Sequence, residues 1–125
     1  EDFVIATGVT TTIRDFVKMS FAELGIELEF KGEGVNETAS VTKCNNPEYQ
    51  LEIGKEVIAV DPRYFRPTEV ELLIGNPSKM KEKLGWEPKY DLKALVKDMI
   101  WADIKLFNRD QYLIDGGHKV LNYHE

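Results

Sequence analysis

A helical repeat of apolar residues between two strand-like runs most constrains what this 125-residue chain can fold into. The repeat has three- to four-residue spacing and ends at Gly25; its members are Ile13, Phe16, Val17, Ser20, Phe21 and Leu24. This spacing places them on one face of a helix, and the threonines at 10–12 offer an N-cap. Residues 3–6 are β-branched or aromatic, and residues 26–30 alternate apolar and charged, so both runs predict strands. The pattern predicts an α/β fold.

Further short strands are predicted in the middle of the chain. Residues 32–54 are polar and irregular, with only a weak strand signal at 40–42. Such a stretch is long for a loop in a compact domain, which indicates a functional or a variable segment. Residues 56–60 predict a strand that ends at Asp61-Pro62, and residues 71–74 predict another.

Two more helices are predicted towards the C-terminus. Asn76-Pro77 is typical of a helix start, and Gly85 of the corresponding end. Asp91 is the expected N-cap of a last helix, whose apolar stripe is Leu92, Leu95, Val96, Met99, Ile100, Ile104 and Phe107. Residues 108–125 give no firm assignment. The expected architecture is a small α/β unit of mixed short strands and helices.

Composition excludes several classes of protein. Acidic residues outnumber basic ones by 22 to 16, a net charge of −6, which argues against a nucleic-acid binder. The longest apolar runs, such as residues 57–60, are too short to span a bilayer. A single cysteine, Cys44, excludes an internal disulfide and a cysteine-based zinc cluster. With no signal-like segment at the N-terminus, we expect a cytoplasmic protein.

The first residues of the chain lead to a separate expectation. The sequence begins without Met and is already in the strand-like run at residues 3–6. A strand at that place needs a sheet to join. We therefore expect a fragment of a longer protein.

Three weaker patterns have simpler interpretations. His118 and His124 are six residues apart, which is not the spacing that brings two ligands to one helix face, so solvated tail residues are favoured over a metal pair. Gly32 and Gly34 begin like a dinucleotide loop, but Glu37 stands where the third glycine belongs, which favours a plain turn. Cys44 has no partner histidine in a recognisable pattern.

One segment carries more specific chemistry: residues 61–70, Asp-Pro-Arg-Tyr-Phe-Arg-Pro-Thr-Glu-Val. The proline at position 67 holds Arg66 in extended backbone geometry, which directs its side chain. A guanidinium suits phosphate oxygens, and the carboxylate of Glu69 can accept hydrogen bonds from ribose hydroxyls. The alternative is a surface salt bridge between Arg66 and Glu69. The residues alone leave both possibilities open.

Together with its surroundings, this segment resembles the extended short-chain dehydrogenase/reductase enzymes that modify nucleotide sugars. The closest resemblance is to the GDP-mannose 4,6-dehydratase family, through residues 1–8, 58–70 and 84–88. The Leu-Gly-Trp-x-Pro piece at 84–88 is shared widely among such enzymes, whereas the first two stretches are more specific. The resemblance covers residues 1–107 as a nucleotide-sugar binding portion, fits poorly at 36–53, and leaves 108–125 as a tail of unclear structure.

The resemblance implies the C-terminal, substrate-binding part of a Rossmann-type enzyme. Such enzymes bind NADP at a glycine-rich turn and use a Thr, a Glu and a Tyr-x-x-x-Lys pair nearer the N-terminus; no tyrosine in this chain has a lysine four positions on. The implied reaction is NADP-dependent conversion of GDP-mannose to GDP-4-dehydro-6-deoxymannose, on the route to GDP-fucose, by oxidation at the fourth carbon, loss of water across the fifth and sixth, and return of the hydride to the sixth. We expect the full-length enzyme to be a homo-oligomer.

The resemblance also assigns roles to two residues. It implies that Arg66 contacts the diphosphate and Glu69 the ribose, with no catalytic, cofactor-binding or metal-binding residue in this chain. Arg63 and Tyr64 lie in the same motif without an assigned contact. Arg14 is another conceivable ligand group, although a solvated helix face is favoured. The rival hypothesis is a non-catalytic nucleotide-binding or interaction module, which a glycine-rich turn and a Tyr-x-x-x-Lys pair upstream would exclude.

Overall fold

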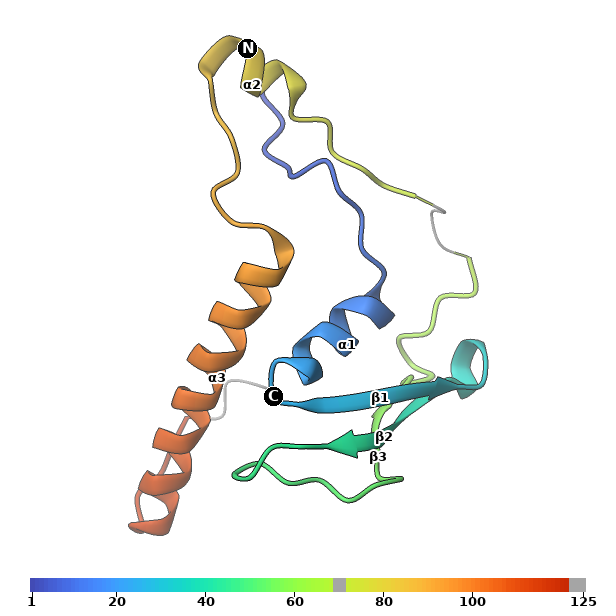
Figure 1. Ribbon diagram of the computed structural model, residues 1–125, viewed down its shortest axis with the longest axis vertical. Coiled ribbons are helices and arrows are strands. Elements are labelled where there is room, and N and C mark those ends of the chain that lie inside the picture. The colour runs from blue at the N-terminus through green and yellow to red at the C-terminus, as the bar shows by residue number, and fades with distance from the viewer. Residues whose placement is uncertain (69–71, 122–125) are drawn as a thin grey trace.

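The computed structural model describes residues 1–68 and 72–121 and has mixed α/β architecture, as predicted (Figure 1). A small antiparallel sheet lies beside one short helix, and a long helix runs past both. The elements in chain order are α1 (Ile13–Ala22), β1 (Ile26–Lys31), the 3₁₀ turn η1 (Gly34–Asn36), β2 (Thr38–Cys44), β3 (Glu56–Ala59), α2 (Ser78–Leu84) and α3 (Leu92–Asp115).

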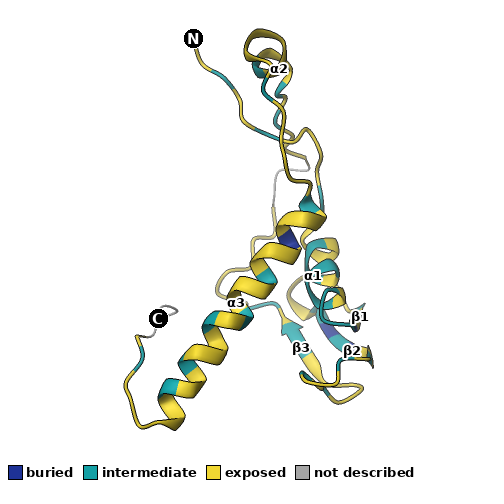
Figure 2. Ribbon diagram, turned by 60° about the vertical axis from the view of Figure 1, so that its left-hand side comes forward, coloured by how far each residue is buried: buried dark blue, intermediate teal, exposed yellow. Residues whose placement is uncertain are grey.

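The sheet has the order β1-β2-β3, with every neighbour antiparallel. Leu28 pairs with Val41 across the first ladder, and Ala39 pairs with Ile58 across the second. Helix α1 packs against β1, and α3 packs against α1. Figure 2 shows buried positions confined to the sheet and to the part of α3 beside α1. The buried apolar residues are Ile26, Ala39, Val41 and Val96.

The N-termini of α1 and α3 confirm the capping predicted from the sequence, whereas α2 has Pro77 and not Asn76 at its N-cap, without a side-chain cap hydrogen bond. Thr12 accepts a hydrogen bond from the backbone N–H of Asp15, and Asp91 accepts one from that of Ala94. Gly85 ends α2 in the left-handed conformation that glycine favours. Helix α3 extends to Asp115, beyond its predicted apolar stripe, so the first part of the expected tail is helical.

Two predicted strands are wrong. Residues 3–6 and 72–74 are extended but form no ladder, and Glu71 lies outside the described residues. The two segments run side by side: the hydroxyl of Thr10 donates to the carbonyl of Leu73, and a Cβ at Gly75 would meet the side chain of Ala6. Two extended segments by themselves form a sheet of only marginal stability. This explains why residues with high β-propensity do not form strands here.

The stretch at 32–54 is also more ordered than predicted. Its weak strand signal at 40–42 expands to β2, the central strand of the sheet, with η1 directly before it. Polar residues such as Thr42 and Lys43 are exposed, while Ala39 and Val41 are buried. Pairing on both edges therefore compensates for the low β-propensity of this sequence.

Candidate functional site

The arginine-proline segment begins with a tight turn directly after β3. The backbone carbonyl of Asp61 accepts a hydrogen bond from the N–H of Tyr64 at 3.0 Å. Pro62 occupies the second position of this turn, where its restricted φ is favourable. The side chain of Asp61 also accepts from the backbone N–H of Arg63 at 2.9 Å. The start of the segment is thus well fixed.

Arg63 stabilises the same turn through its side chain. Its Nη2 lies 2.7 Å from Oδ2 of Asp61, although 80% of the Arg63 side chain is exposed. The side-chain hydrogen bond from Arg63, followed by the backbone one, holds the pKa of Asp61 below its usual value. The sequence left Arg63 without an assigned contact, and the structure gives it this one.

Arg66 follows the turn as an exposed residue. Pro67 comes directly after it and disfavours helical geometry at Arg66. Glu69, the second predicted ligand, lies outside the described residues. Both the ribose contact of Glu69 and the alternative salt bridge to Arg66 therefore stay predictions.

Phe65 connects this segment to the turn before β2. A Cβ at Gly34 would lie 3.4 Å from Cζ of Phe65, so the ring lies next to this glycine. Phe65 is 40% exposed, whereas the neighbouring Tyr64 is 78% exposed. The residue directly before Arg66 therefore lies close to η1.

A cavity of about 280 Å³ lies between α1 and the sheet, next to the start of this segment. Val60, which leads into Asp61, lies on its wall. The lining residues are Thr12, Ile13, Arg14, Val17, Phe30, Glu37, Ile58 and Val60. The cavity is thus apolar with one pair of opposite charges.

Arg14 and Glu37 form that charged pair. Arg14 Nη2 donates to Glu37 Oε2 at 2.9 Å, and Arg14 Nε donates to Oε1, so the contact is bidentate. The guanidinium hydrogen bond holds the pKa of Glu37 below its usual value, despite some opposing desolvation. The predicted solvated position of Arg14 holds only in part, because its side chain is 57% exposed but paired.

The lowered pKa of Glu37 predicts a specific pH dependence. A carboxylate with a depressed pKa in the folded state stabilises the fold above its unfolded pKa, and that contribution is lost as the pH falls through the folded value. We expect Glu37 to titrate at lower pH in the intact chain than in the Arg14→Gln variant, followed by carbon NMR of its carboxyl group. An unchanged Glu37 titration in the variant would contradict the pairing.

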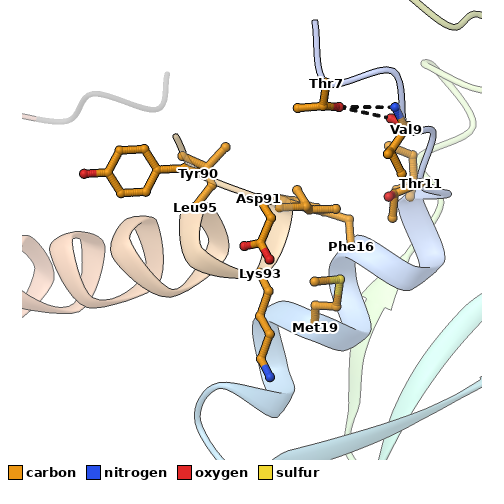
Figure 3. A pocket seen from close by; sticks show the side chains of 11 residues that line it. Thr7, Val9, Thr11, Phe16, Met19, Tyr90, Asp91, Lys93 and Leu95 are labelled. Carbon is orange, nitrogen blue, oxygen red and sulfur yellow. Dashed lines mark hydrogen bonds between the residues drawn. The ribbon is translucent and has the colours of Figure 1, made fainter. Parts of the chain in front are cut away.

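A larger cavity of about 700 Å³ lies where α1, the start of α3 and residues 7–13 meet (Figure 3). Phe16, Met19 and Leu95 contribute apolar surface to it. Its aspartate, Asp91, is engaged in capping α3. This cavity favours apolar contacts over recognition of a charged nucleotide.

The weaker sequence candidates have local structural roles where the structure describes them. Cys44 Sγ donates to the carbonyl of Tyr49 and accepts from the N–H of Leu51. Gly32 and Gly34 form a turn, as predicted, that leads into β2. Within residues 1–68 and 72–121, no group of three His, Cys, Asp or Glu side chains could hold a metal ion. No helix in these two ranges is long and apolar enough to cross a membrane. His124 lies outside these ranges.

Sequence reasoning missed Glu37 as a partner of Arg14. The two residues are 23 positions apart, and their approach depends on the packing of α1 beside β1. The only available signal was the acidic residue at the place of a third glycine. Such a signal excludes a dinucleotide loop but does not identify an ion pair.

Comparison with known proteins agrees with the resemblance noted in the sequence. The chain is 46% identical over 121 residues to a GDP-mannose 4,6-dehydratase of Vibrio cholerae, 44% over 110 to GDP-mannose 4,6 dehydratase 2 of Caenorhabditis elegans, and 42% over 106 to the human GDP-mannose 4,6 dehydratase. These alignments cover 96%, 88% and 85% of this chain but only 32%, 26% and 26% of the relatives.

The chain thus spans about a third of the length of the relatives that it matches. The family model described as GDP-mannose 4,6 dehydratase matches residues 1–99, which include α1, the whole sheet, the arginine-proline segment, α2 and the start of α3. Since both comparisons extend over most of the chain, this chain belongs to the GDP-mannose 4,6-dehydratase family.

Proposed function

We propose that this chain is the C-terminal part of a GDP-mannose 4,6-dehydratase and holds the GDP portion of GDP-mannose. The observation that carries this proposal is the 46% identity to a dehydratase across 96% of the chain. The arginine-proline segment lies within the matched residues, and its first residues are fixed by the Asp61 turn. An exposed arginine two residues after a fixed turn is suited to bind an anion that approaches from solvent.

Within this proposal, Arg66 binds the diphosphate and Glu69 binds the ribose. A guanidinium presents paired, planar N–H donors to phosphate oxygens, and an ionised carboxylate accepts hydrogen bonds from two neighbouring hydroxyls. Arg66 then supplies electrostatic attraction and orientation, while Glu69 selects the sugar of the nucleoside. Neither group takes part in bond breaking, so both act on substrate affinity.

The described residues do not fit NADP. A dinucleotide cradle needs a glycine-rich turn that opens a helix, whereas the turn at Gly32 leads into the three-residue η1 and then a strand. A Cβ at Gly32 would overlap the carbonyl of Asn36, so this glycine is required by the closure of its own turn. We therefore assign NADP and the catalytic groups of the lyase reaction to a part of the enzyme outside this chain. As expected from the sequence, we also propose that the enzyme is cytoplasmic and forms a homo-oligomer.

Calorimetry with the isolated chain and with the full-length enzyme tests this proposal. We expect the 125-residue chain to show no heat of NADP binding, since its described residues form no cradle for the cofactor. The full-length enzyme should bind NADP and convert GDP-mannose to the 4-dehydro-6-deoxy sugar. Micromolar NADP binding to the isolated chain would contradict our placement of the cofactor. GDP binding by a full-length protein without turnover would instead support a non-catalytic nucleotide-binding module.

A further inference from the structure

The ion pair between Arg14 and Glu37 joins two elements that are distant in sequence. Arg14 lies in the first turn of α1, and Glu37 directly follows η1. The Arg14 side chain is 57% exposed, but that of Glu37 is only 16% exposed. The carboxylate is therefore largely covered, and its two oxygens both accept from the same guanidinium.

The turn that carries Glu37 is tightly closed. The N–H of Asn36 donates to the carbonyl of Glu33, and the N–H of Glu37 donates to that of Gly34. Gly32 has a φ of +85°, and a side chain there would overlap the backbone of Asn36. Glu37 and Gly34 are therefore joined directly by a backbone hydrogen bond of this turn.

Gly34 is also the residue next to which the Phe65 ring lies. The Phe65 ring lies 3.4 Å from the position of a Cβ on Gly34, and Arg66 is the next residue along the chain. The contacts thus form a continuous series from α1, through η1, to the arginine-proline segment. The cavity of about 280 Å³ is lined by Arg14, Glu37 and Val60, so it borders both the ion pair and the start of this segment.

We propose that Arg14 and Glu37 are a positioning pair that holds η1 against Phe65 and thereby sets the direction of Arg66. This inference rests on the proposed function, because it assumes that Arg66 binds the diphosphate of GDP. The pair acts through the backbone of the turn and does not itself contact the nucleotide. Glu37 is suited to this role because its side chain is only 16% exposed and both of its carboxylate oxygens accept from Arg14.

The first experiment removes the charge of Glu37 in the full-length enzyme and keeps the size of its side chain. Glu37→Gln keeps the shape of the side chain but loses the charge-assisted contact. We expect GDP binding to weaken about three- to tenfold, less than for loss of the diphosphate contact itself. Hydroxyl-radical footprinting should show faster oxidation of Phe65, up to about twofold, since its ring is 40% exposed in the intact turn. Tyr64, already 78% exposed, is the internal control in the same peptide.

The second experiment reverses the pair. The double variant Arg14→Glu with Glu37→Arg should recover most of the GDP affinity and the slow oxidation of Phe65, while each single charge reversal should lose both. A matched control is Glu27→Gln, which removes an exposed ion pair to Lys43 on the sheet and should change neither readout. Recovery in the double variant supports a positioning role, because a ligand arginine moved to position 37 would not face the same phosphate.

The outcomes distinguish this inference from the proposed function. Weak GDP binding in Arg14→Glu that the double variant does not recover would overturn the inference and indicate direct contact between Arg14 and the nucleotide. Unchanged GDP affinity in Glu37→Gln, in an enzyme that binds GDP normally, would also overturn it. An enzyme without affinity for GDP would contradict the proposed function, and the Phe65 oxidation rate would then still decide whether the pair holds η1 against the segment.

Discussion

Replacing Arg66 with lysine is expected to weaken GDP binding to the full-length enzyme about ten- to a hundredfold. Lysine keeps the positive charge but loses the planar, paired donors of the guanidinium. A hydrogen bond to a charged group contributes ~1.5–3 kcal/mol, which corresponds to about this change in affinity. The Asp61 turn and the Phe65 contact depend on other atoms, so the fold and NADP binding should not change.

Glu69→Gln is the matched comparison for this experiment. An amide oxygen still accepts a hydrogen bond from a ribose hydroxyl, so GDP affinity should decrease less than in Arg66→Lys. If Arg66 and Glu69 form only a surface pair, each substitution should change stability by less than ~1 kcal/mol and leave affinity intact. Dissociation constants for GDP and melting temperatures of both variants separate these cases. Unchanged GDP affinity in Arg66→Lys would exclude the diphosphate contact.

The local features of this fold were accessible from the sequence because they depend on neighbouring residues. The threonine N-cap, the helical repeat from Ile13 to Leu24 and the glycine at position 85 each depend on residues close together in the sequence. Because these features involve only short stretches of sequence, they predicted the helices, as α1, α2 and the start of α3 confirm. The alternation at residues 26–30 likewise predicted β1.

The strand predictions failed where the outcome depends on pairing. Residues 3–6 and 72–74 have the composition of strands, yet no neighbouring strand completes their hydrogen bonds in the described structure. Residues 38–44 have a weaker signal but lie between β1 and β3, and they form the central strand. A strand is thus determined by its neighbours more than by its own composition.

The candidate site likewise contains features that depend on neighbouring residues and contacts that depend on the packed fold. The arginine-proline segment was recognisable from the sequence, because Pro67 restricts the backbone of Arg66 directly before it. The ion pair between Arg63 and Asp61 is also local, since the two residues are separated by a single proline. By contrast, the pairing of Arg14 with Glu37 and the contact of Phe65 with Gly34 require the packed fold.

Gly32→Ala is expected to destabilise the chain by about 2–5 kcal/mol, the larger part of which comes from steric overlap. A left-handed φ costs a non-glycine residue roughly 1–2 kcal/mol. At Gly32, with φ +85°, the added Cβ would also overlap the carbonyl oxygen of Asn36 and lie 3.0 Å from its carbonyl carbon. These are backbone atoms of a closed turn, so relief requires the turn to open, at a further cost of about 1–3 kcal/mol.

Gly54→Ala separates the two contributions, because Gly54 has a φ of +87° but nothing within 4 Å of the added Cβ. It carries the same backbone penalty without the overlap, so we expect a loss of only about 1–2 kcal/mol. The free energies of unfolding of the two variants, measured by circular dichroism in urea, give the steric cost as their difference. Equal losses would show that the Gly32 turn opens without resistance. Because η1 also supports Phe65, Gly32→Ala in the full-length enzyme should weaken GDP binding as well, and Gly54→Ala, in the connection between β2 and β3, should not.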